Sequence, residues 1–225
     1  MALDLDLGLN NWMSRAFAYP EKRLDRGKIL TAEELESLED YGRYKDVDGD
    51  GIPYRTIPGI RHPKGTLVAR GSGRNQYGKY SERPEDYIGE MDRLARKFET
   101  ARSHVPKPVV DIREEAYVGL VAYGSTDLAM QECRDQLERE YGLKTSYLRV
   151  RALPFASDVR SFVAEHDSVY VIEQNRDGQL ADLMKLEVGR DCEKIHKVLH
   201  YGGIPVDARF VTDRIVEYRK LERVD

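Results

Sequence analysis

The stretch from Tyr117 to Asp127 constrains the fold of this chain more than any other. An apolar run over residues 117–123 leads into a turn at Gly124, Ser125 and Thr126, and a helical pattern follows. A short apolar run that is bounded by turn residues and followed by an amphipathic segment is typical of a central parallel strand and its crossover helix. The sequence therefore predicts an α/β domain in the second half of the chain.

The rest of the C-terminal half repeats this pattern. Further strands are predicted at residues 144–150 and 168–173. Helices are predicted to begin at a cap on Ser125 or Thr126 and at a cap on Ser157, and two more lie around residues 180–186 and 192–199. A short strand near residues 208–210 and a last helix capped by Thr212 complete the prediction. Right-handed βαβ crossovers then give a mostly parallel sheet with helices on both faces.

The N-terminal half is more polar and carries two predicted helices. One spans residues 26–43, where Thr31 and Glu34 have the spacing of a capping box. The other spans residues 84–103, and apolar side chains recur on one of its faces at Tyr87, Met91, Leu94, Ala95 and Phe98. The proline-rich residues 104–108 then form the expected linker between the two halves.

Composition excludes several classes of function. The 225 residues include 36 Lys and Arg against 40 Asp and Glu, a net charge of −4, so no electrostatic footprint for nucleic acid is visible. No apolar run is long enough for a bilayer, and the first residues carry acids rather than the basic residues of a signal peptide, so we expect a cytoplasmic protein with no membrane partner. Cys133 and Cys192 lie far apart, so they predict neither a zinc site nor an iron–sulfur cluster in this chain.

An acidic loop stands out in the N-terminal half. Asp46, Asp48, Asp50 and Gly51 match the first half of a calcium-binding loop, in which alternate carboxylates converge on one cation. The twelfth position, where such a loop has a glutamate, is Ile57. Two interpretations stay open: a divalent metal site formed by the three aspartates, or a solvated acidic turn.

Two further groups of polar residues are candidates for binding. In parallel sheets ligands approach the carboxyl ends of the strands, where the sequence places Ser125, Thr126, Glu173, Asn175, Arg176 and Asp177. These residues suit the rim of a site or an interface, although capping explains the two hydroxyls equally well. A glycine-rich loop with Arg70 and Asn75 could bind a carboxylate or a phosphate, or could simply be a connection. No complete catalytic set is visible.

Several long segments resemble one enzyme family, the alpha subunits of the 2-oxoacid:ferredoxin oxidoreductases, and the 2-oxoglutarate type most closely. The segments that carry this resemblance are LDLDLGLNNWMS at residues 3–14, GRYKDVDGDGIPYRT at 42–56, MDRLARKF at 91–98, AYGSTD at 122–127, TSYLRVRALP at 145–154 and EQNRDGQ at 173–179. One departure from the family pattern lies near Arg74, Asn75 and Gln76, where a histidine followed by Asn or Asp and then an acid is expected.

The resemblance implies a domain organisation. Residues 1–25 would be the remnant of a pyrimidine-binding thiamine diphosphate domain, residues 26–108 an extended linker with helices, and residues 109–225 a transketolase C-terminal-like domain. Asn10, Asn11, Arg70 and Asn75 would lie next to cofactor or substrate. Alpha subunits of this family continue for several hundred residues before the segment at residues 3–12, so the chain is expected to be a C-terminal part.

The resemblance also implies an activity of the whole complex. Such enzymes oxidatively decarboxylate a 2-oxoacid to an acyl-coenzyme A with thiamine diphosphate and magnesium, and reduce ferredoxin through [4Fe–4S] clusters. The partners would be a beta subunit, which holds the cluster and the magnesium motif, and the remaining alpha-subunit domains. This chain alone is expected to bind no cofactor and to be inactive. The alternative is a stand-alone protein-interaction module whose acidic loop binds a divalent cation.

Overall fold

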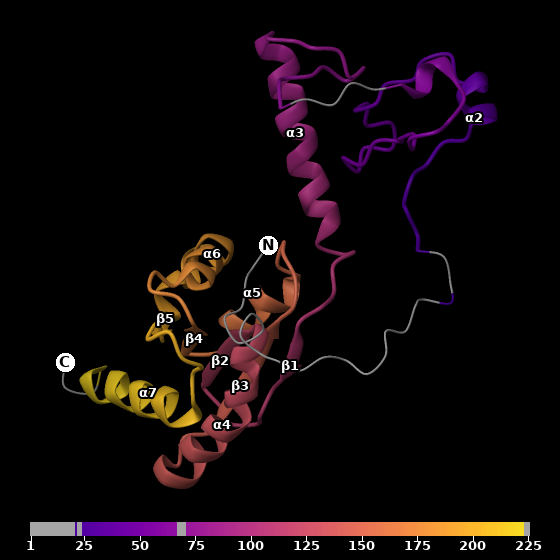
Figure 1. Ribbon diagram of the computed structural model, residues 1–225. Helices are drawn as coiled ribbons and strands as arrows, with labels where there is room; N and C mark the ends of the chain where they lie inside the picture. The colour runs from indigo at the N-terminus through magenta and orange to yellow at the C-terminus, as the bar shows by residue number, and fades with distance from the viewer. Residues whose placement is uncertain (1–20, 22–23, 67–70, 223–225) are drawn as a thin grey trace. The chain divides into compact units, whose positions relative to one another are not determined.

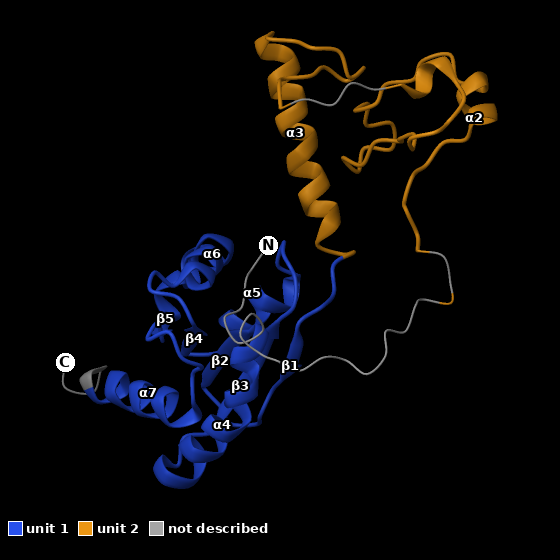
Figure 2. Cartoon of the chain, viewed as in Figure 1, with its two compact units in different colours: residues 1–13, 105–225 blue, residues 14–104 orange. Residues whose placement is uncertain are grey.

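The computed structural model describes residues 21, 24–66 and 71–222. The chain divides into two compact units, residues 14–104 and residues 105–225 together with 1–13 (Figure 2). Each unit has an architecture of its own.

The C-terminal unit is built on a five-stranded sheet with the strand order β1-β3-β2-β4-β5 (Figure 1). The strands are β1 (Val109–Asp111), β2 (Val118–Tyr123), β3 (Thr145–Val150), β4 (Ser168–Glu173) and β5 (Ile195–Leu199). β2 pairs in parallel with β3 and β4, and β4 pairs in parallel with β5, whereas β1 is antiparallel to β3. The stretch that begins at Tyr117 is therefore the central strand, as the sequence predicts.

Helices cover both faces of this sheet. Successive residues of a strand point to opposite faces, so neighbouring residues of β2 belong to two different hydrophobic cores. Leu120 faces α4 (Asp127–Tyr141) and α7 (Ala208–Glu222), in one hydrophobic core. The next residue, Val121, faces the second core with α5 (Ser157–Ala164) and α6 (Gln179–Val188). Both residues are fully buried, which explains the continuous apolar run of β2. The predicted α/β sheet with helices on both faces is confirmed.

Two predicted elements near the C-terminus are wrong. Residues 192–199, predicted as a helix, form the end of the 3-10 segment η3 (Gly189–Lys194) and then β5. Ile195 and Val198 are buried three residues apart, a spacing that also suits a helix, and only the pairing with β4 decides for a strand. Residues 208–210, predicted as a strand, are the first turn of α7.

Among the predicted caps in this unit, Thr126 is at the predicted position but does not cap through its side chain, whereas Ser157 and Thr212 are wrong. Thr126 and Ala156 are the N-cap residues of α4 and α5, and neither makes a side-chain capping hydrogen bond, while Ser157 is already inside α5. Thr212 lies within α7, where its buried hydroxyl donates to the Gln136 side-chain oxygen at 2.9 Å. By contrast, the predicted end of α4 at Gly142 is confirmed, with a left-handed φ of 64°.

The N-terminal unit contains little regular structure: α2 (Ala32–Ser37), the 3-10 segment η1 (Pro63–Gly65) and α3 (Pro84–Ala101) are its described helices. The capping box of Thr31 and Glu34 is confirmed, since Glu34 N donates to Thr31 Oγ1 at 3.2 Å and Thr31 N to Glu34 Oε2 at 2.7 Å. The helix is much shorter than the predicted 26–43 because the backbone is extended from Leu38. None of the described helices combines the length and the hydrophobicity that a membrane span requires.

The long helix α3 confirms the prediction for residues 84–103 but not the role of its apolar face. Tyr87, Met91 and Phe98 are 63%, 41% and 59% exposed, whereas Arg93 is the buried residue of the helix. The helix packs within its unit through the polar face around Arg93. An amphipathic pattern predicts a helix reliably, but here it does not tell which face the unit itself buries.

Candidate functional site

The carboxyl end of β4 brings several predicted site residues together. Glu173 is fully buried, and its carboxylate accepts hydrogen bonds from Leu180 N and Ala181 N, both at 2.9 Å, in the first turn of α6. Asn175 Nδ2 also donates to Glu173 Oε2 at 2.7 Å. A carboxylate at a helix N-terminus satisfies free backbone donors and complements the helix dipole. Glu173 therefore fastens α6 to the sheet.

The loop after Glu173 is shaped by Asn175. Its side-chain oxygen accepts from Gly178 N at 2.7 Å, and Gly178 adopts a left-handed φ of 72° at the start of α6. Arg176 and Asp177 follow in the same loop and form an exposed ion pair at 2.7 Å. These two are the members of the predicted group that a partner could reach directly.

The predicted residues of the neighbouring loop lie next to this strand end. Gln174 Nε2 donates to Ser125 Oγ and to Thr126 Oγ1, both at 3.2 Å. The two hydroxyls thus link the ends of β2 and β4 rather than cap α4. The structure brings Ser125, Thr126, Glu173 and Asn175 to one edge of the sheet, the edge formed by the carboxyl ends of β2 and β4. Their hydrogen bonds hold the loops and α6 in place there.

The acidic loop surrounds the side-chain amine of a lysine, Lys28. Lys28 Nζ donates to Asp48 Oδ2 at 2.5 Å, to Asp50 Oδ2 at 2.7 Å and to Ile52 O at 3.0 Å. Asp46 points elsewhere: its carboxylate accepts from Gly51 N at 3.0 Å and pairs with Arg96 of α3 at 3.0 Å. The three aspartates that the sequence offers for a metal are therefore divided between a lysine and an arginine.

These contacts shift the pKa values of the loop. Burial disfavours the charged form of Lys28, but the hydrogen bonds from Lys28 to Asp48 and Asp50 outweigh it and raise the lysine pKa. The hydrogen bond from Lys28, followed by that from Ile52 N, lowers the pKa of Asp50. Both groups are held in their charged forms at neutral pH, as a mutual ion pair requires.

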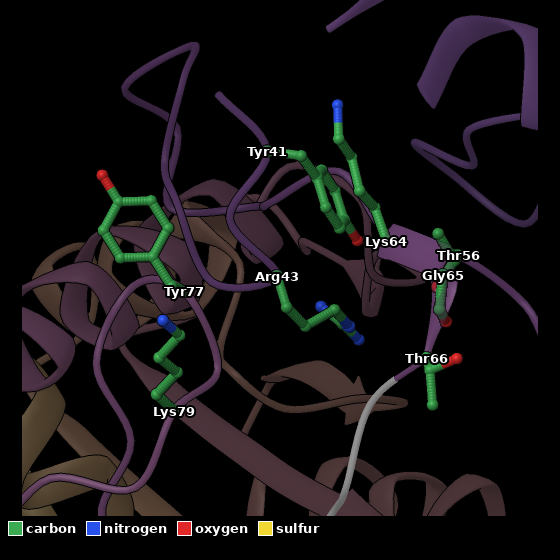
Figure 3. A pocket seen from close by; sticks show the side chains of 8 residues that line it. All are labelled: Tyr41, Arg43, Thr56, Lys64, Gly65, Thr66, Tyr77 and Lys79. Carbon is green, nitrogen blue, oxygen red and sulfur yellow. The ribbon is translucent and has the colours of Figure 1, made fainter. Parts of the chain in front are cut away.

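A cavity of about 410 Å³ lies in the N-terminal unit and was not predicted from the sequence (Figure 3). Its lining consists of Tyr41, Arg43, Thr56, Lys64, Gly65, Thr66, Tyr77 and Lys79, which include three cationic side chains and no carboxylate. The lining comes from four separate segments, at residues 41–43, 56, 64–66 and 77–79, so no local motif predicts it. A signal that the sequence does offer is a tyrosine two residues before a basic residue, at 41–43 and again at 77–79.

The glycine-rich loop contributes to this cavity through its turn. Asn75 Oδ1 accepts from Tyr77 N and from Lys79 N, both at 3.1 Å, and thereby fixes the residues that carry two lining side chains. Asn75 is therefore not part of the cavity lining, but it stabilises the turn that carries Tyr77 and Lys79. Asn10, Asn11 and Arg70, the other residues predicted next to cofactor or substrate, lie outside the described residues.

The described residues do not fit the metal groups that the resemblance implies for the complex. Within residues 21, 24–66 and 71–222, no group of three or more His, Cys, Asp or Glu side chains is arranged to hold a metal ion. Cys133, which is buried in α4, and Cys192, which lies in η3, are both free cysteines. Burial raises the pKa of the Cys133 thiol to about 11, which keeps it protonated and a poor ligand.

A mostly parallel, open sheet between two layers of helices places the C-terminal unit in the α/β class. A solved structure of 2-oxoglutarate:ferredoxin oxidoreductase from Magnetococcus marinus, with 2-oxoglutarate, coenzyme A and succinyl-CoA bound, matches 81% of the chain with a TM-score of 0.67 and 24% identity. The chain thus shares the fold of part of that protein and spans 31% of its length.

Two other solved structures are more distant. The inactive beta4 tetramer of a split-gene transketolase gives a TM-score of 0.42 at 17% identity, over 49% of this chain and 41% of that chain. The alpha chain of a probable 2-oxoacid ferredoxin oxidoreductase from Thermoplasma acidophilum gives 0.34 at 24% identity, over 50% and 96%. At these scores neither establishes a shared fold. No protein-family model and no curated protein matches the chain.

Proposed function

We propose that this chain is the C-terminal part of the alpha subunit of a 2-oxoacid:ferredoxin oxidoreductase of the 2-oxoglutarate type. The observation that carries the proposal is the fold shared with 2-oxoglutarate:ferredoxin oxidoreductase over 81% of the chain. The C-terminal unit, residues 105–225 together with 1–13, makes up less than two thirds of the chain, so this match includes residues of both units. The long segments of sequence resemblance support the same assignment.

In this proposal the chain keeps the organisation inferred from its sequence. Residues 1–25 are the remnant of a thiamine diphosphate domain, residues 26–108 are a linker with helices, and residues 109–225 are the transketolase C-terminal-like domain. The complex oxidatively decarboxylates a 2-oxoacid such as 2-oxoglutarate to an acyl-coenzyme A and reduces ferredoxin, with the cytoplasm as its expected location. Thiamine diphosphate supplies the electron sink, and the clusters on the partner subunit carry the electrons.

The contribution of this chain is to support the thiamine site and the subunit interface. The sheet edge with Ser125, Thr126 and Glu173 is held by internal hydrogen bonds, which suits a rigid surface for docking. Arg176 and Asp177 extend from that edge into solvent and are the proposed contacts to a beta subunit. No residue of the chain is proposed to act in the chemical step.

Reconstitution tests the proposal. The isolated chain, given 2-oxoglutarate, coenzyme A, thiamine diphosphate and magnesium, is expected to reduce no ferredoxin surrogate. Co-expression with the remaining alpha-subunit domains and a cluster-bearing beta subunit is expected to yield a stable complex that does. Turnover by the isolated chain, or failure to co-purify with both partners, contradicts the proposal.

A charge-reversal pair sharpens the test. Arg176→Glu replaces an exposed charge at the sheet edge and should weaken assembly at least tenfold without lowering the melting temperature of the free chain. Arg139→Glu makes the same change on the exposed side of α4 and serves as the control, with assembly unchanged. Equal effects of the two variants would remove the sheet edge from the proposed interface.

A further inference from the structure

The cavity of the N-terminal unit has the properties of a site for a small anion. Its volume of about 410 Å³ lies in the range of small-molecule pockets. A lining with three cationic side chains and no carboxylate is unusual in a chain whose net charge is −4. Clustered like charges repel one another, so such a wall is more stable when an anion neutralises it.

Two of the three cations are available for a ligand. Arg43 and Lys79 make no ion pair with a described residue, and the Arg43 guanidinium lies 5.2 Å from the centre of the Tyr44 ring, a contact that orients it without neutralising its charge. In Figure 3 the guanidinium points toward the middle of the labelled side chains. Its planar set of donors suits the paired oxygens of a carboxylate or a phosphate.

The third cation has a structural role. Lys64 Nζ donates to Leu38 O at 2.5 Å and to Leu35 O at 3.3 Å, the free carbonyls at the end of α2. Its amine accordingly points away from Arg43 in Figure 3. Lys64 therefore adds positive potential to the cavity wall but is not a ligand contact. This leaves Arg43 and Lys79 as the pair that would bind.

The hydroxyl of Tyr41 is a second, independent observation on this cavity. The hydroxyl of Tyr41, which lines the cavity, is buried and has no hydrogen-bond partner among the described residues. Buried polar groups are normally hydrogen-bonded, and this hydroxyl is free to bond with a molecule in the cavity. The hydroxyl of Thr66 also lines the cavity, on an exposed residue. The cavity thus combines two cations that have no counter-ion among the described residues with unused hydrogen-bonding capacity.

The frame of the cavity is fixed by backbone contacts. Tyr44 N donates to Gln76 O at 2.9 Å, which joins the segment of Arg43 to the turn that carries Lys79. A Cβ added at Gly42 would lie 2.6 Å from Gln76 O, so the two segments approach as closely as only glycine allows. The two cations are therefore held on one frame rather than on independent loops.

We propose that this cavity binds a small molecule through an oxyanion group, a carboxylate or a phosphate, held by Arg43 and Lys79. The proposal does not depend on the assignment to an oxidoreductase, because binding is measured on the 225-residue chain without partners. The two sources of the oxyanion are distinguished by the probes: inorganic phosphate for phosphate esters and succinate for dicarboxylates.

Isothermal titration calorimetry of each probe against the full chain tests the proposal. Saturable binding of phosphate or of succinate is expected, with an affinity that falls as sodium chloride is raised. Preference for one probe identifies the class of the natural ligand, and equal affinity identifies the shared oxyanion as the feature recognised. Binding of neither probe at about 10 mM, on the order of the weakest specific affinities, overturns the proposal.

Matched charge removals locate the binding. Arg43→Gln should weaken the binding of the preferred probe about tenfold or more, and Lys79→Gln about fivefold. Lys97→Gln removes the same charge from an exposed position of α3 outside this lining and should leave the affinity within about twofold. If Lys97→Gln weakens binding as much as Arg43→Gln, the effect is general electrostatics and the proposed site is wrong.

Discussion

The replacement of Gly51 by alanine should detach the acidic loop from α3. Gly51 has a φ of 76°, and a Cβ built there would lie 2.3 Å from Lys97 N and 2.6 Å from Arg93 O, both in the backbone of α3. Backbone atoms of a helix cannot rotate away as a side chain can. The added methyl group therefore forces the whole segment and the helix apart.

Side-chain hydrogen bonds from α3 reach the loop at Gly51 O, at Asp50 O and at the Asp46 carboxylate, and the Gly51→Ala substitution should break the first two. Arg93 Nη1 donates to Gly51 O at 2.9 Å, and Thr100 Oγ1 donates to Asp50 O at 2.7 Å. The left-handed backbone costs an alanine about 1–2 kcal/mol, and overpacking against backbone adds about 1–3 kcal/mol or more. We expect Gly51→Ala to lower the free energy of local opening by about 2–5 kcal/mol.

Gly49 provides the matched control. Its φ of 77° is nearly the same, but a Cβ there would have no atom within 4 Å. Gly49→Ala should therefore cost only the backbone strain, about 1–2 kcal/mol. Hydrogen exchange of peptides from α3, followed by mass spectrometry, measures both changes. Equal loss of protection in the two variants would refute the argument that close approach, rather than backbone conformation, requires Gly51.

Three other predictions concern single side chains. Lys28→Met should destabilise the chain by about 1–2 kcal/mol at pH 7. The lowered pKa of Asp50 and the raised pKa of Lys28 make this contribution constant between about pH 4 and 10. It should disappear as pH falls through the folded-state pKa of Asp50 or rises through that of Lys28, and denaturant unfolding across pH would contradict this if the difference persisted in acid. Glu173→Ala should cost about 2–3 kcal/mol, because Leu180 N and Ala181 N lose their acceptor, and an unchanged melting temperature would exclude this role. Tyr41→Phe should leave the melting temperature of the free chain unchanged or higher, whereas Tyr147→Phe should lower it, since only the Tyr147 hydroxyl has a hydrogen bond that the substitution removes, to Asp127 at 2.7 Å.

The elements of the C-terminal unit that were predicted best are those whose local sequence pattern favours the same structure as their packing in the fold. Residues 168–173 form a strand with the predicted bounds, and Gly142 ends α4 as predicted, because burial on both faces and a left-handed cap produce recognisable sequence patterns. The edge strand β5 was missed, since an edge strand is half-exposed and its apolar residues can mimic a helix. Its identity is decided by pairing with β4, which no local pattern contains.

The acidic loop shows why site residues are harder to predict than elements. Asp46, Asp48 and Asp50 do lie close together in sequence, as a metal loop requires, but a neighbouring segment supplies Lys28 as the cation for two of them. The pairing joins residues 20 and 22 positions apart, so spacing within the loop could not disclose it. The cavity shows the same limit, because Arg43 and Lys79 are far apart in the sequence and line one cavity where their segments are joined by the hydrogen bond from Tyr44 N to Gln76 O.

The helix α3 joins these observations in one physical argument. Its buried residue is Arg93. The guanidinium donates to Gly51 O at 2.9 Å and to the Glu90 carboxylate at 2.7 Å. A buried charge is tolerated only when such partners compensate it. The apolar side chains of Tyr87, Met91 and Phe98 are left exposed. Exposing apolar side chains to water costs free energy. This orientation of α3 is therefore stable only if its polar contacts with the acidic loop contribute more free energy than burial of the three apolar side chains would. The acidic loop, through Gly51 and its aspartates, therefore determines which face of α3 remains open.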